Sequence, residues 1–583
     1  MEKFLAALAA ADLDKAASYT DQKDATEQAW NDSWKGLQAE GLTTTLKEVN
    51  TAPGDGVSAT AQYTVSWRLP QDREFSYDAS ATLTRNNGAW TIRYQPTMIF
   101  PRLGAQQHLE LRPLQSQKAN VVSADGAELM RPGLAYRILV DTAEMTTAAQ
   151  TASAIAAALD QLHDQDESVP TMAAGDLAHT LAEQSGTYSV AALRSPIAAG
   201  IEEKLADVPG VRINQEPAMV RSDPGFAPEL MARVENVIAD GQEGTPGWTI
   251  AAVNPNGAVI DTFEKHQPEA APAIRVSIDH SMQVAAQEAV DLRPEMKAMI
   301  VAIRPSSGDI LAVAQTKKAD EDGDVALSGQ FPPGSTFKMI TAAAGMQRLG
   351  LNPESIVPCP GTMEIGNRIV HNYNDFSKGN VPLQAAFAAS CNTSFADISA
   401  QLEPGQLQQD AKSFGLGRDF DIPGFTTLTG SVPPGQELVD RTEAGFGQGK
   451  DLASPFGLAL VAATAAHGQT PIPQLISGHP TTVKDPDVPA PAPEVIENLQ
   501  HMMRAVVTEG TARGMRSAGE IHGKTGEAEI AGGSHAWFAG YRDDVAFATL
   551  IVLGGGSESS VAITDHFLSR MDELKAAGLS SAQ

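Results

Sequence analysis

The chain has 583 residues, of which 42 are basic and 71 acidic, so its formal net charge is −29. This surplus of negative charge repels nucleic acid and anionic lipid surfaces, and both are excluded as partners. The length predicts about two to four domains. The two cysteines and twelve histidines show no metal-ligand spacing, so no metal and no cofactor are expected.

The first predicted domain covers residues 1–103 and holds four of the six tryptophans. Two helical stretches come first. The alternating runs 59–68 and 75–85 then predict strands, and an Asn-Asn-Gly turn at 86–88 predicts a hairpin with a further strand at 90–94.

The N-terminal residues 1–11 predict an amphipathic helix, because their apolar positions follow helical spacing. Their apolar run is short and Glu2 cancels Lys3, so they do not fit a signal peptide. No stretch of the chain reaches the ~20 apolar residues of a membrane span.

The second and third predicted domains cover residues 104–272 and 273–583. Ala-rich helices (143–162, 176–184, 197–206) alternate with short strands in the second domain. The third combines helices with an antiparallel sheet, and together the domains predict a multidomain α+β protein. A Pro-rich linker at 480–493 precedes a helix that begins near Glu494.

Ser335 and Lys338 form a Ser-x-x-Lys segment that follows a Pro-Pro-Gly breaker and opens a helical run. Helix positions three apart share a face, so the amine points at the hydroxyl. A serine needs a base to take its proton, and a lysine can be that base when burial or a neighbouring cation such as Lys524 lowers its pKa. Alone, the segment favours a plain helix N-cap with a solvated lysine.

A second motif, Ser390-Cys391-Asn392, lies in the stretch 383–402, which is Ala-rich, lacks Gly and Pro, and predicts a helix. Ser390 can relay a proton between a lysine and an amine, and the Asn392 amide can pair with a peptide bond. Small residues are also ordinary fillers of a buried helix. Cys391 and Cys359 either form a disulfide, in an oxidising compartment, or are core residues.

A third motif, Lys524-Thr525-Gly526, begins a region of β-rich runs that continues through 536–541 and 545–553. These runs predict adjacent antiparallel strands. Lys524 and Thr525 can bind a carboxylate by charge and hydroxyl, and Gly526 lets a ligand backbone approach the strand. A hairpin strand with a solvated lysine is the alternative for this motif alone.

The three motifs, in this order, resemble those of the class B penicillin-binding proteins, monofunctional D,D-transpeptidases of cell-wall peptidoglycan. The segments 274–287 and 299–314 are similar to the opening of that family's transpeptidase domain, and 447–449 resembles its Gly-Gln-Gly segment. The pattern of the first domain resembles the nuclear-transport-factor-2-like domain of some members. The resemblance implies a spacer domain (1–103), a pedestal or dimerisation domain (104–272) and a transpeptidase domain (273–583).

The resemblance implies that a serine attacks the D-Ala-D-Ala donor of one stem peptide, and that an amine of a second stem peptide takes the acyl group. β-Lactams acylate the same serine as covalent inhibitors. The implied roles are nucleophile for Ser335, base for Lys338, proton relay for Ser390, substrate ligands for Asn392, Lys524, Thr525, Gly526 and Glu527, and oxyanion hole for the backbone N–H groups of Ser335 and Glu527.

Glu527 departs from the family pattern, because many members have Thr after Lys-Thr-Gly. It places a negative charge near the expected carboxylate pocket. We expect its side chain to point away from that pocket or to pair with a cation.

Two rival functions stay open at this point. A D,D-carboxypeptidase or β-lactamase would use water as acceptor, and a non-catalytic β-lactam receptor or scaffold would only bind. The large N-terminal half favours the transpeptidase, and the complete set of catalytic side chains disfavours the scaffold. The resemblance also implies the extracytoplasmic face of the bacterial cell membrane, an anchor absent from this sequence, and partner proteins of cell-wall synthesis in division or cell shape.

Overall fold

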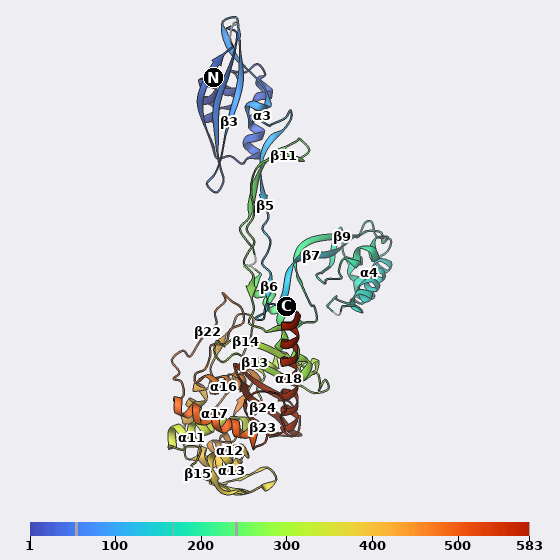
Figure 1. Cartoon of the computed structure of the whole chain (residues 1–583). Coiled ribbons are helices and arrows are strands. Elements are labelled where there is room, and N and C mark those ends of the chain that lie inside the picture. The colour runs from blue at the N-terminus through green and yellow to red at the C-terminus, as the bar shows by residue number, and fades with distance from the viewer. Residues whose placement is uncertain (53–55, 167, 240–242, 582–583) are drawn as a thin grey trace. The chain divides into compact units, whose positions relative to one another are not determined.

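The chain folds into two compact units. The structure, a computed structural model, describes residues 1–52, 56–166, 168–239 and 243–581. The N-terminal unit comprises Met1–Ala119 and Gln242–Pro272, and the C-terminal unit comprises Asn120–Gly241 and Ala273–Gln583. Figure 1 colours the chain from blue at the N-terminus to red at the C-terminus.

The N-terminal unit begins with three helices and a four-stranded antiparallel sheet of order β1-β2-β3-β4. Their bounds are α1 (Glu2–Ala9), α2 (Leu13–Ala17), α3 (Lys23–Gly36), β1 (Gly41–Thr51), β2 (Ser58–Leu69), β3 (Arg73–Asn86) and β4 (Ala89–Arg93). Alternate residues of β2 are buried, and Trp67 packs against Trp30 at 5.9 Å between ring centroids. The predicted hairpin is confirmed, since Asn87 and Gly88 both have positive φ.

A second sheet of the same unit joins segments distant in sequence, in the order β11-β10-β5. Its strands are β5 (His108–Leu114), β10 (Gly247–Val253) and β11 (Val259–His266). Ile250 and Ala252 are fully buried in the hydrophobic core that Trp30 and Trp67 also occupy. Residues 247–266 therefore return to the N-terminal unit after the intervening chain has entered the other unit.

Residues 120–241 form one part of the C-terminal unit. The central strand β7 pairs with β6, β8 and β9. The elements are β6 (Val121–Val122), β7 (Glu128–Asp141), α4 (Ala148–His163), α5 (Ala174–Glu183), β8 (Thr187–Leu193), α6 (Gly200–Leu205), β9 (Val211–Arg221) and α7 (Pro228–Ile238). The helix expected from residue 143 begins only at Ala148, because the Thr147 side chain caps it by accepting from Gln150 N.

The rest of the C-terminal unit is built on a five-stranded antiparallel sheet of order β14-β13-β25-β24-β23. The strands are β13 (Ala298–Ile303), β14 (Ile310–Gln315), β23 (Ile521–Ile530), β24 (Gly533–Arg542) and β25 (Val545–Ile551). Every residue of β25 is buried, as expected of an inner strand that packs against helices. The predicted antiparallel strands and the α+β class are confirmed.

Helices pack on this sheet and carry much of the core. The main ones are α8 (His280–Val290), α11 (Lys338–Leu349), α16 (Pro455–His467), α17 (Pro493–Thr508) and α18 (Glu558–Ser581). Nearly all of α16 is buried, so it is apolar all round. Figure 1 shows α17 beside β23, in agreement with their contacts. Within the described residues, no helix is long and apolar enough to cross a membrane.

The remaining elements of this unit are short. They are β12 (Ile274–Arg275), α9 (Lys317–Asp320), α10 (Val325–Ser328), β15 (Ile356–Cys359), β16 (Thr362–Ile365), β17 (Arg368–His371), β18 (Gly379–Pro382), α12 (Leu383–Ala388), α13 (Asn392–Ala400), α14 (Gln406–Ser413), α15 (Leu438–Ala444), β19 (Phe420–Asp421), β20 (Gly430–Ser431), β21 (Leu452–Ala453) and β22 (Thr482–Val483). The described residues also include three 3₁₀ turns: η1 (Pro96–Met98) in the N-terminal unit, and η2 (Gly334–Phe337) and η3 (Tyr373–Asp375) in the C-terminal unit.

The expectation of one helix over residues 383–402 is wrong. The stretch divides into α12 and α13, because Ser390 adopts a left-handed conformation with φ 60°. A left-handed residue ends the regular hydrogen-bond pattern of a right-handed helix.

Gly447 offers a test of how tightly the chain is packed around η2. It has φ +75°, its carbonyl accepts from Gly334 N at 2.9 Å, and a Cβ added there would lie 2.0 Å from Gly334 O. Gly447→Ala should lower the free energy of unfolding by about 1–3 kcal/mol, measured by denaturant titration. Gly350→Ala is the matched control, since Gly350 has φ +68° but open space around it. Equal losses in both variants would show that the close approach contributes nothing.

Candidate active site

Side chains from all three motifs meet around the amine of Lys338. Its Nζ lies 2.9 Å from Ser335 Oγ, 2.7 Å from Asn392 Oδ1 and 2.7 Å from the Ser390 carbonyl oxygen. Lys524 Nζ donates to Ser390 Oγ at 2.9 Å, and Lys338 Nζ lies 3.3 Å from the same hydroxyl. The structure thus brings Ser335, Lys338, Ser390, Asn392 and Lys524 into one connected network.

Ser335 lies in the turn η2, directly before α11. The Thr336 hydroxyl donates to Pro333 O at 2.6 Å, which fixes the Pro-Pro-Gly segment against the turn. Lys338 is the first residue of α11 and is fully buried, whereas Ser335 is only half-buried. The nucleophile is therefore accessible to a substrate while the amine behind it is shielded from water.

Lys524 occupies the strand β23, which contacts η2. It is fully buried, and its Nζ also donates to Thr525 O at 2.9 Å. Thr525 is buried as well, and its hydroxyl bonds to that of Thr511, a residue that no sequence motif singled out. Gly526 must be glycine here, because a Cβ would lie 2.9 Å from the Thr336 side chain.

Both buried lysines have pKa values below that of a free lysine. Burial, and then the charge of Lys524, lower the pKa of Lys338 well below its usual value. Burial lowers the pKa of Lys524 to about 7. Within the described residues no carboxylate pairs with either amine. An amine in such surroundings can be neutral near pH 7 and accept a proton from the adjacent serine.

The residue before Ser335 lies against the backbone of Glu527, and Ser335 and Glu527 are the two residues expected to form an oxyanion hole. A Cβ added to Gly334 would lie 2.6 Å from Glu527 O and 3.0 Å from Ala528 N. Gly334 has φ +51°, so both its conformation and its surroundings require glycine. Glu527 is part of this contact, and Ser335 directly follows Gly334 in the chain.

The Glu527 side chain is half-buried and accepts a hydrogen bond from Ser534 Oγ at 2.8 Å. Ser534 lies on the neighbouring strand β24, and its hydroxyl also donates to Gly555 O at 3.1 Å. In the described part of the chain, Glu527 forms no ion pair. Of the two outcomes expected for Glu527, pairing with a cation is not found among the described residues, and its carboxylate pairs with the Ser534 hydroxyl instead.

Cys359 and Cys391 form a disulfide with a Cα–Cα distance of 6.1 Å. The bond joins β15 to the residue between Ser390 and Asn392, and both cysteines are fully buried. Of the two alternatives left open by the sequence, the structure shows the bridge.

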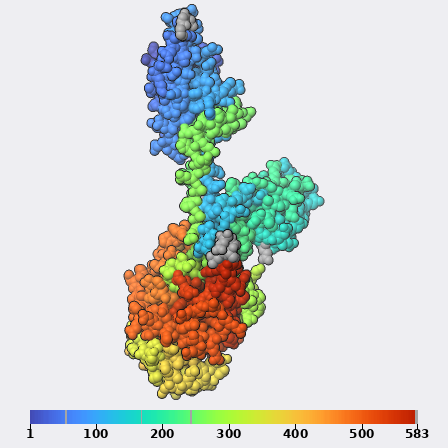
Figure 2. All heavy atoms as spheres, in the orientation of Figure 1, coloured from blue at the N-terminus to red at the C-terminus, as the bar shows by residue number. Residues whose placement is uncertain are grey.

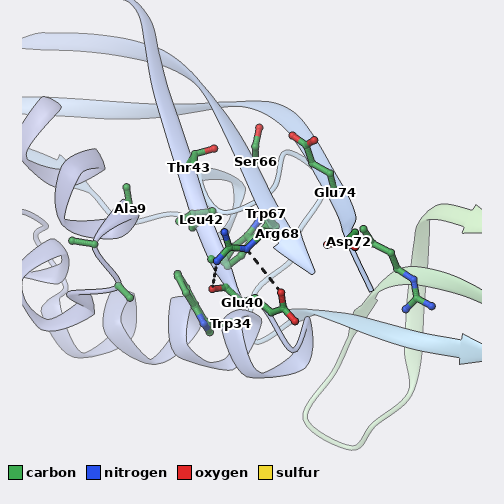
Figure 3. A pocket seen from close by; sticks show the side chains of 14 residues that line it. Ala9, Trp34, Glu40, Leu42, Thr43, Ser66, Trp67, Arg68, Asp72 and Glu74 are labelled. Atoms are coloured by element: carbon green, nitrogen blue, oxygen red, sulfur yellow. Dashed lines mark hydrogen bonds and ion pairs between the residues drawn. The ribbon is translucent and has the colours of Figure 1, made fainter. Parts of the chain in front are cut away.

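A cavity of about 600 Å³ lies elsewhere, in the N-terminal unit (Figure 3). Trp34 and Trp67 contribute to its wall, and the Arg68 guanidinium bonds to the Glu40 carbonyl at 3.1 Å. Its described lining pairs no serine or cysteine with a buried base. The lysine–serine network, rather than this cavity, is therefore the candidate active site.

Comparisons with known proteins agree with this assignment. Residues 298–568 match the family model described as penicillin binding protein transpeptidase domain, and residues 1–107 match the NTF2-like N-terminal transpeptidase domain. Together the two matches cover well over half of the chain. The chain belongs to the penicillin-binding protein family.

Curated relatives of this penicillin-binding protein include two peptidoglycan D,D-transpeptidases. MrdA of Acinetobacter baumannii is 26% identical over 349 residues, which are 51% of this chain and 50% of MrdA. PbpA of Mycolicibacterium smegmatis is 27% identical over 387 residues, which are 57% of this chain and 76% of PbpA. The alignment thus spans about half the length of MrdA.

Among solved structures, the complex between penicillin-binding protein PBP2 and MreC from Helicobacter pylori matches with a TM-score of 0.60 and 16% identity. The match covers 80% of this chain and 99% of the solved one. At this identity the likeness establishes the fold alone.

The effect of the Lys524 charge on the pKa of Lys338 can be tested by the direction in which that pKa moves when the charge is removed. Lys524→Met removes the charge that lowers the pKa of Lys338, so that pKa should rise. The acid limb of the pH profile for acylation by a penicillin should then move to higher pH. If the variant is slower but its acid limb stays where it is in the wild type, the coupling is absent.

Proposed function

We propose that this chain is a serine-type peptidoglycan D,D-transpeptidase that works through an acyl-enzyme on Ser335. One observation carries the proposal: a fully buried lysine amine lies 2.9 Å from the hydroxyl of a half-buried serine, beside a second buried lysine. The names of the curated relatives support the choice of peptidoglycan stem peptides as substrate.

In the first step, Ser335 Oγ attacks the carbonyl carbon of the penultimate D-Ala of a stem peptide. Its proton passes to the neutral amine of Lys338, and negative charge develops on the carbonyl oxygen. The backbone N–H groups of Ser335 and Glu527 donate to that oxygen, a contribution of about 3–4 kcal/mol per donor. The C–N bond then breaks, and the nitrogen of the leaving D-Ala takes a proton through Ser390.

In the second step, the amine of another stem peptide attacks the acyl-enzyme carbonyl. Ser390 Oγ, within reach of both lysine amines, accepts the proton of this amine and transfers it to Lys338. The Oγ–C bond breaks, Ser335 regains its proton, and the new amide is the cross-link. β-Lactams acylate Ser335 by the first step alone, because their amide presents the same carbonyl and carboxylate.

Residues of the second and third motifs also position the donor stem peptide. Lys524, Thr525 and Gly526 bind the terminal carboxylate and the peptide backbone beside β23. Asn392 pairs with a peptide bond of the donor through its amide. The pKa values of both lysines are lowered, so a bound carboxylate stabilises the protonated form of Lys524, and the charge of Lys524 then keeps Lys338 neutral.

We further propose a spacer role for residues 1–103, a pedestal or dimerisation role for 104–272 and the transpeptidase role for 273–583. The strands β5, β10 and β11 fall within the second of these ranges but pack with the first. The working place is the extracytoplasmic face of the bacterial membrane, where oxidising conditions favour the buried disulfide. A protein of cell-wall synthesis is the proposed partner, and the similar solved structure, a complex of PBP2 with MreC, supports the binding of a partner protein.

Product analysis tests the proposal against hydrolysis. The protein is incubated with a stem-peptide donor and an amine acceptor, and cross-linked and hydrolysed products are separated by mass. The wild type should give mainly the cross-linked product, and Ser335→Ala neither product. Hydrolysed donor alone would identify a carboxypeptidase instead.

Glu527 should slow reaction with anionic ligands, because its charge has a hydroxyl partner and no cation among the described residues. Replacing it in Glu527→Thr should speed acylation by benzylpenicillin by about fivefold, from a Coulomb energy of about 1 kcal/mol at 4 Å in water. The gain should shrink at high salt. The control is Glu529→Thr, an exposed position on the same strand. Equal rates for Glu527→Thr and the wild type would rule out a repelling Glu527.

A further inference from the structure

Ser390 has an unfavourable backbone conformation that something must stabilise. Its φ is 60°, a left-handed conformation that an L-residue with a side chain rarely adopts. In that conformation both its carbonyl and its hydroxyl face Lys338 Nζ, at 2.7 and 3.3 Å. The position of the proposed base thus depends on a turn that the local sequence does not favour.

One side of this turn is tied to residues 358–372, the bracing segment, which runs from β15 through the β16–β17 hairpin. The disulfide joins Cys359 to Cys391. The Thr393 hydroxyl donates to Pro360 O at 2.9 Å, and the Ser394 hydroxyl donates to Pro358 O at 2.6 Å. Both hydroxyl residues are fully buried.

Asn372, at the end of the bracing segment, is 3% exposed, and both the nitrogen and the oxygen of its side-chain amide form hydrogen bonds. Its Nδ2 donates to Pro360 O at 2.8 Å and to Phe376 O at 2.9 Å. Its Oδ1 accepts from Thr393 N at 3.1 Å, at the start of α13. One buried side chain therefore connects the bracing segment to the helix that carries Asn392.

Asn392 is fixed from the same segment. Its Nδ2 donates to His371 O at 2.9 Å, which leaves its Oδ1 to accept from Lys338 at 2.7 Å. This contact also determines which end of the amide faces the lysine. The outer side of the bracing segment is open to solvent, since Ile369 is 53% exposed, and Figure 2 shows this yellow part of the chain on the surface of the C-terminal unit.

We propose that Asn372 and the Cys359–Cys391 bridge are positioning elements for acyl transfer, which set the Ser390 turn and thereby the dry environment of Lys338. The inference rests on the proposed function. Neither element is among the residues proposed to bind the substrate. A displacement of about 1 Å in such a network can cost about 100-fold in rate. Water admitted by a loosened turn would raise the pKa of Lys338, because burial is what lowers it most.

The bridge makes the activity sensitive to reductant. A dithiol that reaches Cys359 or Cys391 cleaves the S–S bond, yields two protein thiols and is itself oxidised to a disulfide. Because both sulfurs are buried, reduction is slow in the folded protein and needs either a high dithiol concentration or local opening of the bracing segment.

The test compares Asn372→Ala and Cys359→Ala with the wild type and with Asn380→Ala, an exposed asparagine on the adjoining strand β18. Acylation by a fluorescent penicillin is followed across pH, and the rate constant is separated from the binding constant. Both positioning variants should lose about 10- to 100-fold in the rate constant, and their acid limb should move to higher pH. The control should match the wild type.

A variant that only lowers stability would reduce the active fraction without moving the pH profile. A positioning variant that folds and keeps both the rate constant and the profile overturns the assignment for that element. If neither variant folds, the test uses wild-type protein whose disulfide is reduced by dithiol, with the reduction checked by thiol labelling. The acylation rate should fall on reduction and recover after reoxidation. An unchanged rate in the reduced protein would contradict the role of the bridge. Wild type that is not acylated at all would instead refute the proposed function.

Discussion

The burial of two lysine amines beside two serine hydroxyls is the constraint on which the rest of the C-terminal unit depends. Lys338 and Lys524 are fully buried, and no described carboxylate neutralises them. Burying an unpaired ammonium is so costly that the group instead gives up its proton. This energetic cost of burial is what lowers the pKa of Lys338, the proposed base, and the surrounding packing must supply the stability that the buried lysines remove.

The surrounding chain supplies this stability through backbone contacts that admit no side chain. Gly334 lies against the Glu527 backbone and Gly447 lies against Gly334, so the turn η2 is enclosed between β23 and the loop before β21. The Ser390 turn lies between α12 and α13, and the disulfide ties the residue after it to β15. Both turns carry unusual φ values, and both present a hydroxyl to the same amine.

Much of this site could be predicted from the sequence because its chemistry resides in short motifs. The spacing of Ser335 and Lys338 on adjoining helical turns, and the strands after Lys524, follow from local periodicity. The left-handed Ser390 could not be predicted, since Ala-rich sequence favours helix and only tertiary contacts reverse that preference. Asn372 gives no local signal either, because its partners at Pro360 and Thr393 become neighbours only in the folded chain.

The account's central claim is that Ser335 becomes covalently acylated because Lys338 removes its proton. Intact-mass measurement after benzylpenicillin treatment, with wild type and Ser335→Ala side by side, tests it most directly. The account predicts one added penicillin mass on the wild type, located by peptide mapping to the segment that contains Ser335, and none on the variant. An equal adduct on Ser335→Ala would contradict it.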